Sequence, residues 1–264
     1  MKYFRYWVKE PFDIRVGNVV ERINILAGSN KSKEDAHDQA VQRSRFIEQR
    51  ISKRESKKEY DAPIREHVAE VLDDRNIITV CRYGAKILNT TQYTILDLDD
   101  YAFNFFDLFK AIRKLPKKER IVQKFLQRIE EFPELGRDFR IYETSKGVRV
   151  IGKKYIDPNG ANYELMMRKL AVDWLYIVLS QKQNCYRARI SPKPYRTRID
   201  TIKVRSPLDC ETEQYREWAE IYERASENYQ VVKHVLSLGK DFSADPVIRM
   251  HDSVCKAFDD KTLA

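Results

Sequence analysis

Short strand-like segments alternate with helix-like segments at irregular intervals along this chain of 264 residues. A parallel sheet built from strand–helix–strand units needs regular spacing between its strands, and this sequence does not show it. We therefore predict an α+β protein, with a central, partly antiparallel sheet flanked by helices and a C-terminal helical region. No internal repeat and no Gly/Ser-rich linker interrupts the pattern.

Three parts are expected along the chain: N-terminal strands with surface helices (1–75), an α+β core (76–208) and C-terminal helices (209–264). The strand pattern of apolar and β-branched residues is found at 2–8, 18–27, 76–81, 94–99, 139–142, 148–151 and 185–190. The helical patterns and their start and stop signals are found at 33–57, 62–74, 103–114, 116–131, 160–182, 211–238 and 246–258. A turn is expected at 11–17.

The longest unbroken apolar run, Trp174–Leu179, has six residues. A membrane span needs about 20 such residues, so no membrane association is expected. Lys9 and Glu10 stand where a secretory signal needs an apolar stretch. The four cysteines are widely separated and form no CxxC pair, which favours reduced thiols and a cytoplasmic location.

Basic residues are concentrated in the segment 137–206, which holds 16 Lys and Arg but only six Asp and Glu. This segment therefore carries +10, and the rest of the chain −1. Such a surplus attracts polyanions, although counter-charges from elsewhere in the fold would turn it into an ordinary solvated face. In a strand over 185–190, Arg187 and Arg189 would share one face and suit phosphate oxygens.

The sequence Ile95-Leu-Asp-Leu-Asp-Asp100 ends a predicted strand in acidic residues. Asp97 and Asp99 would project from the same face, about 7 Å apart at their Cα atoms, because side chains in a strand alternate. Two such carboxylates suit a divalent cation, Mg²⁺ or Mn²⁺, which also binds phosphate. The alternative is a plain strand end with Asp100 capping the next helix.

A polar turn lies between the two strands of the expected hairpin at 139–151. Ser145 and Lys146 could offer a hydroxyl group and a cation to phosphate there, with Arg149 on the returning strand. The turn could equally be ordinary hairpin chemistry.

Together, these features resemble the catalytic core of archaeo-eukaryotic primases and primase-polymerases, over about residues 76–206. The resemblance implies two-metal nucleotidyl transfer, with Asp97 and Asp99 as catalytic metal ligands and Asp200, in Ile199-Asp200, as a third. It implies that Ser145–Arg149 contacts the nucleotide phosphates, although Arg149 stands where the family has His. Further phosphate contacts are expected from Arg187, Arg189, Lys193 and Arg196.

A second resemblance extends over nearly the whole chain. The segments Arg82–Ala85, Tyr142–Val150, Asp157-Pro158 and Arg187–Pro194 are similar to those of uncharacterised bacterial proteins. This resemblance implies a bacterial or phage setting and no particular activity.

Two other readings stay open. A non-catalytic nucleic-acid-binding module needs only the basic segment and aromatic side chains that stack on bases; the candidates are Tyr155, Tyr163, Trp174, Tyr176, Tyr186 and Tyr195. A haloacid-dehalogenase-type phosphohydrolase also begins with a DxD strand, and Thr144 or Ser145, Lys193, Asp241 and Asp245 could supply its later motifs. Against that second reading, Tyr101 stands at its fifth position, and 231–238 reads as a helix end.

The histidines add little at this stage. His37 and His67 are expected on exposed polar helices, and His234 on the long C-terminal helix. His251 and Asp252 are expected to form an ordinary surface pair, and could act in catalysis only if folded against Asp97.

Overall fold

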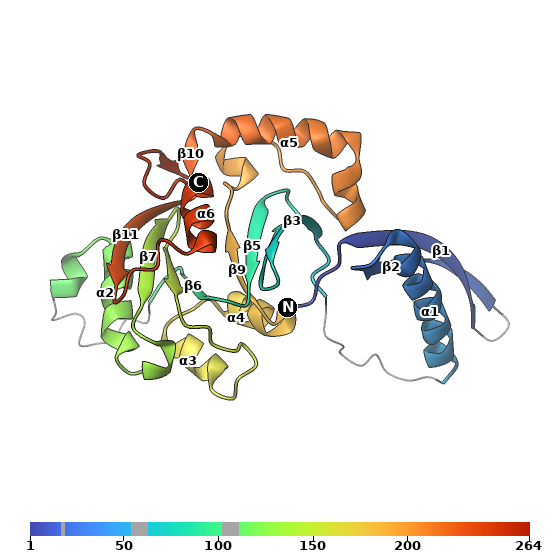
Figure 1. The fold of residues 1–264 in the computed structure, drawn as a ribbon, viewed down its shortest axis with the longest axis horizontal. Helices are drawn as coiled ribbons and strands as arrows, with labels where there is room; N and C mark the ends of the chain where they lie inside the picture. Colours follow the sequence, from blue (N-terminus) through green and yellow to red (C-terminus); the bar gives the residue numbers. More distant parts are fainter. Residues whose placement is uncertain (17–18, 54–62, 102–110) are drawn as a thin grey trace.

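Two four-stranded antiparallel sheets form the centre of the structure, a computed structural model that describes residues 1–16, 19–53, 63–101 and 111–264 (Figure 1). The first sheet contains, in spatial order, β11 (Val232–Leu238), β7 (Phe139–Thr144), β8 (Val148–Gly152) and β6 (Thr94–Leu98). The second contains β3 (His67–Asp73), β4 (Asn76–Val80), β5 (Lys86–Thr90) and β9 (Tyr186–Arg189). The predicted α+β class is therefore confirmed.

The two sheets share one hydrophobic core. Ile78 and Leu88 of the second sheet belong to the same buried cluster as Ile95 and Val150 of the first. Helices α2 (Lys117–Ile129), α3 (Tyr163–Lys169), α4 (Trp174–Gln183) and α6 (Pro246–Val254) contribute to this cluster. Between the sheets, the Arg149 Nη1 donates a hydrogen bond to the Arg189 backbone oxygen at 2.9 Å, so a side chain of β8 is tied to β9.

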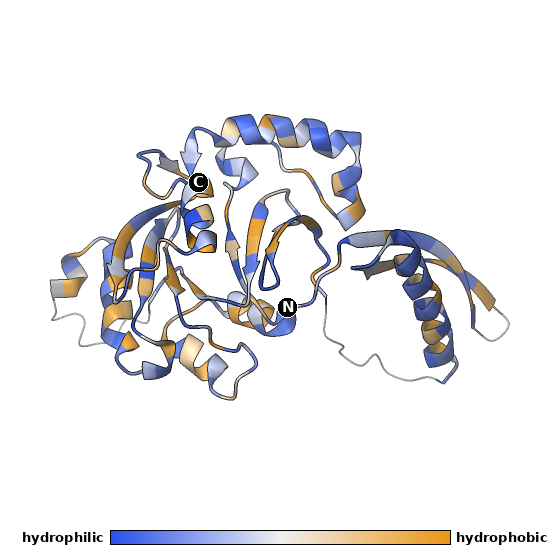
Figure 2. Cartoon of the chain, in the orientation of Figure 1, coloured by the Kyte–Doolittle hydropathy of each residue, from blue (hydrophilic) through white to orange (hydrophobic). Residues whose placement is uncertain are grey.

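A hairpin and a helix form a smaller unit at one end of the molecule, on the right in Figure 1. It consists of β1 (Tyr6–Val16), β2 (Val19–Ser29) and α1 (Lys33–Ser52). Ile25, Ala27 and Ala40 form its own small buried cluster. The outer surface of α1 is mostly hydrophilic (Figure 2), as the sequence predicted, and Ser32 caps its first turn by accepting from the Asp35 backbone N–H.

Most predicted strands are confirmed, and so is the helix expected at 116–131. The turn expected at 11–17 is wrong over residues 11–16, because β1 continues through Pro11, which lies opposite Asn24, to Val16; residue 17 lies outside the described residues. Proline is tolerated here because each strand of a two-stranded ribbon has an unpaired edge. The helix expected at 103–114 lies mostly outside the described residues, and Ala111–Lys114 forms one short 3-10 turn, η2.

Residues 67–73, expected in a helix, form strand β3 instead. Asp73 accepts hydrogen bonds from the Arg75 backbone N–H at 2.7 Å and from the Asn76 side chain at 2.8 Å. These bonds fix a tight turn that returns the chain into β4, so the segment pairs as a hairpin. Val68 and Val71 favour the extended backbone because they are β-branched.

The helix expected at 160–182 is two helices. Ala171, between α3 and α4, has a φ of 61°, which no helix accommodates, and Asp173 caps α4 by accepting from the Tyr176 backbone N–H at 2.9 Å. The small polar cap residue starts a new helix where the apolar spacing alone suggested a continuous one.

The helix expected at 211–238 is wrong in its second half. Helix α5 (Glu213–Ser226) ends early, and β10 (Tyr229–Gln230) and β11 follow. In β11, Val232, His234 and Leu236 are more buried than the residues between them, which is the alternation of a strand. The segment 209–264 is therefore helical only in part: β11 pairs with β7, and β10 pairs with β12 (Thr262–Leu263). Over the described ranges, no helix is long and apolar enough to cross a membrane.

Candidate nucleic-acid interface

Three cations surround one exposed aromatic ring. Tyr195 is 59% exposed, with the Lys193 Nζ 6.0 Å and the Arg196 guanidinium carbon 5.6 Å from its ring centroid. Lys146, from the turn between β7 and β8, is close enough for its charge to act on both Tyr195 and Lys193. We call these four residues the cation–tyrosine cluster. It contains three of the residues that the sequence predicted as phosphate ligands.

Two prolines and local hydrogen bonds fix the backbone around Tyr195. Pro192 and Pro194 are buried on either side of Lys193, and Pro194 begins the single 3-10 turn η4 (Pro194–Arg196). The Thr197 backbone N–H and hydroxyl group both donate to the Pro194 backbone oxygen, at 2.9 and 2.8 Å. Because proline fixes φ, this short segment presents its side chains from a defined backbone.

The turn that carries Lys146 is also well defined. The Thr144 hydroxyl oxygen accepts from the Gly147 backbone N–H at 3.0 Å, and the Thr144 N–H donates to the Gly147 oxygen at 2.9 Å. A Cβ atom on Gly147 would lie 2.1 Å from the Leu98 backbone oxygen, so only glycine fits. Lys146 is exposed at the tip, and Ser145, beside it, is half-buried.

The cations of the cluster form no ion pair within the part of the chain that the structure describes. Lys146, Lys193 and Arg196 form no salt bridge with any of the residues that the structure describes. Burial, and then repulsion by Arg189, Arg196 and Lys146, lowers the pKa of Lys193, with Tyr195 acting in the opposite direction. Partial burial would raise the pKa of Tyr195, but the three surrounding cations lower it. A group of like charges with no counter-ion is the arrangement that attracts an anion.

Arg189 lies beneath the cluster on β9. Its Nη1 donates to the Ser191 backbone oxygen at 2.6 Å, and its side chain is half-buried. Burial, and then the charges of Arg149 and Arg196, lowers its pKa. Arg189 therefore adds positive potential from below, with part of its donor capacity used by the protein.

Arg187 does not belong to the cluster, contrary to the prediction from its alternation with Arg189. It does share one face of β9 with Arg189, since the residues that alternate with them, Tyr186 and Ala188, are buried. Its Nη2, however, lies 2.5 Å from the Glu66 Oε2, and its Nη1 donates to Gln183 at 2.9 Å. The guanidinium group is committed to the protein, because Glu66 comes from a distant segment that local sequence cannot place beside it.

Arg149, predicted as a phosphate ligand, is buried and bound to other parts of the protein. Its side chain is 3% exposed, and its Nε contacts the Asp97 Oδ1 at 3.2 Å. Its Nη1 lies 3.4 Å from the His251 Nε2. Because Arg149 can only donate, the His251 Nε2 accepts, and the His251 Nδ1 therefore carries the hydrogen.

His251 and Asp252 are buried on α6, so the expected surface pair is wrong. The His251 Nδ1 donates to the Asp252 Oδ1 at 3.0 Å. Asp252 also accepts from the Arg140 Nη2 at 2.6 Å and from the Tyr142 hydroxyl group at 2.7 Å. A continuous buried chain thus runs from Asp97 through Arg149, His251 and Asp252 to Arg140. Sequence reasoning missed Arg140 and Tyr142 as partners of Asp252, because their contacts join β7 to a helix more than 100 residues away.

The acidic strand end has two different carboxylates. Asp97 is half-buried and balanced by Arg149, whereas Asp99 is exposed. Asp99 lies against the Lys146 turn, since a Cβ atom on Gly147 would be 3.0 Å from the Asp99 Oδ1. Asp200 is exposed elsewhere, where its backbone oxygen accepts from the Trp218 indole N–H at 2.7 Å.

These residues fit a metal centre poorly. In the parts of the chain that the structure describes, no group of three or more His, Cys, Asp or Glu side chains could hold a metal ion. Asp97, Asp99 and Asp200 therefore do not form the predicted three-ligand site. Arg149 already supplies the positive charge that two neighbouring carboxylates would otherwise take from a cation.

The structure removes one argument against a haloacid-dehalogenase-type site and adds another. The segment before Asp241 is strand β11 and not the helix end that the sequence suggested. Asp241 contacts Arg140 at 3.4 Å, and Asp245 accepts from the Tyr93 hydroxyl group at 3.2 Å. Neither joins Asp97 in a group that could hold a metal ion within the described residues.

Four of the six aromatic candidates for base stacking are covered. Tyr163 and Tyr186 are buried, and Tyr155 and Tyr176 are partly buried. Trp174 is exposed, but the Arg168 guanidinium carbon lies 4.5 Å from its ring centroid. Tyr195 is thus the aromatic residue of this set that lies exposed among unpaired cations.

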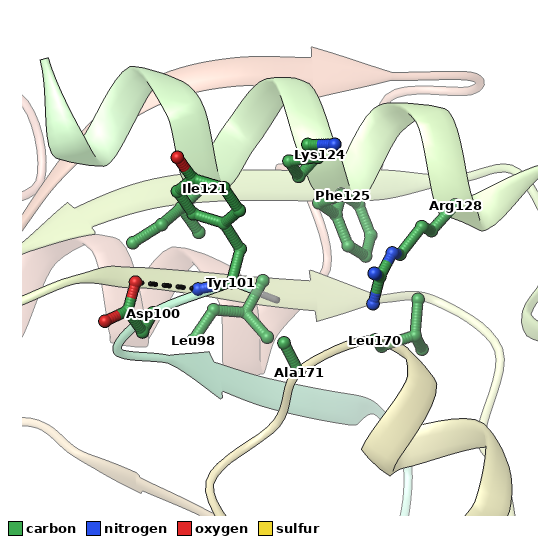
Figure 3. A pocket seen from close by; sticks show the side chains of 9 residues that line it. All are labelled: Leu98, Asp100, Tyr101, Ile121, Lys124, Phe125, Arg128, Leu170 and Ala171. Carbon is green, nitrogen blue, oxygen red and sulfur yellow. Dashed lines mark hydrogen bonds between the residues drawn. The ribbon is translucent and has the colours of Figure 1, made fainter. Parts of the chain in front are cut away.

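A small depression lies on the other side of the acidic strand end (Figure 3). Helix α2 lines it with Ile121 and Phe125, and Leu98 and Leu170 form its apolar floor. Asp100 accepts from the Tyr101 backbone N–H at its rim. Its lining is largely apolar, and none of the cation–tyrosine cluster contributes to it.

No family model, curated protein or solved structure is significantly similar to this chain. The resemblance to primase-polymerases therefore stays a prediction.

Proposed function

We propose that this protein binds nucleic acid through the cation–tyrosine cluster, as a binding module without catalysis at that site. The observation that carries the proposal is the grouping of Lys146, Lys193 and Arg196, unpaired by any described acid, around the exposed ring of Tyr195. Phosphates would take the place of the missing counter-ions, and the ring would offer a surface to a base.

Two further observations are compatible with this proposal. The backbone on both sides of the site is fixed, by Pro192 and Pro194 on one side and by the Gly147 turn on the other. Arg189 raises the potential beneath it. We also propose a cytoplasmic location, since all four cysteines are buried and form no disulfide.

The test is a binding titration with a fluorescent oligonucleotide at several salt concentrations. We expect log K to fall steeply with log salt, and replacing Lys146, Lys193 and Arg196 together by Gln to lower the slope by about two on a single strand. The matched control replaces Arg22, Arg45 and Lys53 in the N-terminal unit by Gln, which changes the net charge equally. Equal effects of the two triple variants, or no binding at low salt, would contradict the proposal.

A second candidate is metal-dependent phosphoryl transfer with Asp97 and Asp99, as the primase resemblance implies. One observation favours it: the exposed Asp99 lies against the turn that carries Lys146, so a free carboxylate borders the proposed phosphate site. If these residues hold Mn²⁺, the ion should raise the melting temperature of the wild type and not that of Asp99→Asn. Nucleotide incorporation or strand cleavage, lost in Asp97→Ala while binding survives, would support catalysis.

A further inference from the structure

We infer that the cation–tyrosine cluster selects single-stranded nucleic acid by stacking one unpaired base on the ring of Tyr195. The inference rests on the proposed function and narrows it to one class of ligand. It depends on how Tyr195 is presented, which the charges alone do not determine.

The ring of Tyr195 contributes nothing to the described hydrophobic core. It is 59% exposed, and it belongs to none of the buried clusters. The cations beside it lie 5.6 and 6.0 Å from the ring centroid, near the outer limit of a cation–π contact. Covering an exposed aromatic ring with a planar base is favourable, because the stacked faces are removed from water.

Trp174 shows what an occupied ring looks like in the same protein. Arg168 lies 4.5 Å from the Trp174 ring centroid, a closer approach than either cation makes to Tyr195, and it also pairs with Glu164 at 2.8 Å. A base would have to displace this arginine before it could stack on Trp174. Lys193 and Arg196 lie farther from the ring of Tyr195, and no acid among the described residues holds either of them there.

Three cations lie near the ring of Tyr195, on which a base would stack. Lys193 precedes the ring and Arg196 follows it along a fixed 3-10 turn, and Lys146 approaches from the β7–β8 hairpin. A strand whose base lies on the ring would bring its neighbouring phosphates to these cations. Stacking platforms among cations are the usual means of binding a single strand without reading its sequence.

A duplex matches this site less well. Its bases are already stacked and paired, so they offer no free face to the ring, and only the phosphate contacts remain. The cluster is formed by two short turns, η4 and the tip of the β7–β8 hairpin, and not by a helix of the kind that enters the major groove. We therefore expect a preference for single strands that depends on Tyr195, and phosphate contacts that do not.

The experiment compares three fluorescent oligomers of equal phosphate number: a thymidine strand, the same strand with abasic residues, and a duplex. Each is titrated with the wild type, Tyr195→Phe and Tyr195→Ala at one fixed salt concentration. We expect Tyr195→Ala to weaken binding of the thymidine strand roughly five- to one-hundred-fold. Tyr195→Phe should bind almost as the wild type does, because the ring remains, and the abasic strand should not distinguish the variants.

The possible outcomes distinguish a failure of the stacking inference from a failure of the proposed nucleic-acid binding. Equal affinity of the wild type for thymidine, abasic and duplex oligomers overturns the inference and leaves phosphate binding intact. So does a loss in Tyr195→Ala that is the same for the abasic strand. Absence of binding to all three oligomers overturns the proposed function itself. Circular dichroism of both variants verifies their folding, which the exposed position of Tyr195 should not disturb.

Discussion

Two groups of cations in the segment 137–206 have different surroundings. Arg140, Arg149 and Arg187 each lie against a carboxylate, at 2.6, 3.2 and 2.5 Å. Lys146 and Arg196, from the same segment, have no such partner among the described residues. The first group joins elements of the fold, and the second leaves its charge toward solvent.

The comparison shows why a count of charges along the chain overstates the basic surface. The acids that balance the buried arginines are Asp252, Asp97 and Glu66, all from outside the segment. A buried charge without a partner is very costly, so the fold recruits these acids across long distances in sequence. The surplus of +10 is therefore partly neutralised inside the protein.

The largest effect is expected from Asp252→Asn, which keeps the size of the side chain and removes its charge. Arg140 would then be buried with its closest carboxylate partner gone, and Tyr142 and His251 would keep only a neutral amide oxygen as their acceptor. We expect the free energy of unfolding to fall by about 3–5 kcal/mol, measured by urea denaturation. Asp241→Asn is the control, since this carboxylate is exposed and its contact with Arg140 is longer, at 3.4 Å. Equal losses of stability in the two variants would contradict a structural role of the buried chain.

The same carboxylate predicts how stability depends on pH. Burial would raise the pKa of Asp252, but hydrogen bonds from His251 and Tyr142, and the charge of Arg140, lower it below its usual value. The folded protein then binds fewer protons than the unfolded chain, whose Asp pKa is about 3.9. This stabilisation is complete above that value and is lost as the pH falls through the lower folded pKa.

Denaturation curves recorded between pH 7 and pH 3 test this sign. The wild type should lose stability below about pH 4 more steeply than Asp252→Asn, because the variant has no carboxylate to protonate there. Parallel curves for the two proteins would show that Asp252 is not held ionised in the folded state.

Local patterns in the sequence predicted those parts of the fold that local interactions determine. Apolar and β-branched residues correctly predicted β6 and β8, and alternation predicted β9. Two of the failures are at β3 and β11, where charged residues interrupt the apolar pattern. In β11, pairing with β7 provides hydrogen bonds that the isolated segment lacks, and this partner is about 90 residues away.

In the candidate site, too, local features were predictable and long-range contacts were not. Lys146, Lys193 and Arg196, which the sequence predicts as phosphate ligands, lie near one another, because rigid turns present each of them locally. The sequence did not indicate that Arg149 and Arg187 pair with acids, because those acids lie far away in sequence. Nothing near Asp97 in the sequence indicated that an arginine would balance it.

A smaller effect is expected at the second buried pair. Glu66 accepts from the Arg187 Nη2 at 2.5 Å and from the Thr79 hydroxyl group at 2.6 Å, and both members of the ion pair are about 15% exposed. Glu66→Gln should reduce the free energy of unfolding by about 1.5–3 kcal/mol. Glu223→Gln is the control, because its pair with Lys86 has a similar length but is exposed; such pairs contribute about 0–1 kcal/mol.

The salt dependence of oligonucleotide binding tests whether Arg187 contacts phosphate. Since Arg187 is committed to Glu66, we expect Glu66→Gln to leave that slope unchanged. A marked change would mean that Arg187 contacts phosphate when its partner is removed.

The smallest effect on stability is expected at the exposed cluster, where Lys146, Lys193 and Arg196 are replaced together by Gln. None of them pairs with a described acid, so no carboxylate is left unbalanced, and changes at such surface positions usually stay within about 0.5 kcal/mol. The sign should be a slight gain, because the lowered pKa of Lys193 shows that the fold disfavours its charged form. Urea denaturation of this variant beside the Arg22, Arg45 and Lys53 triple measures the difference. A loss comparable to that of Asp252→Asn would mean that the cluster stabilises the fold, as the buried arginines do. An unchanged or higher stability, together with lost oligonucleotide binding, would show that the cluster serves binding and the buried arginines serve stability.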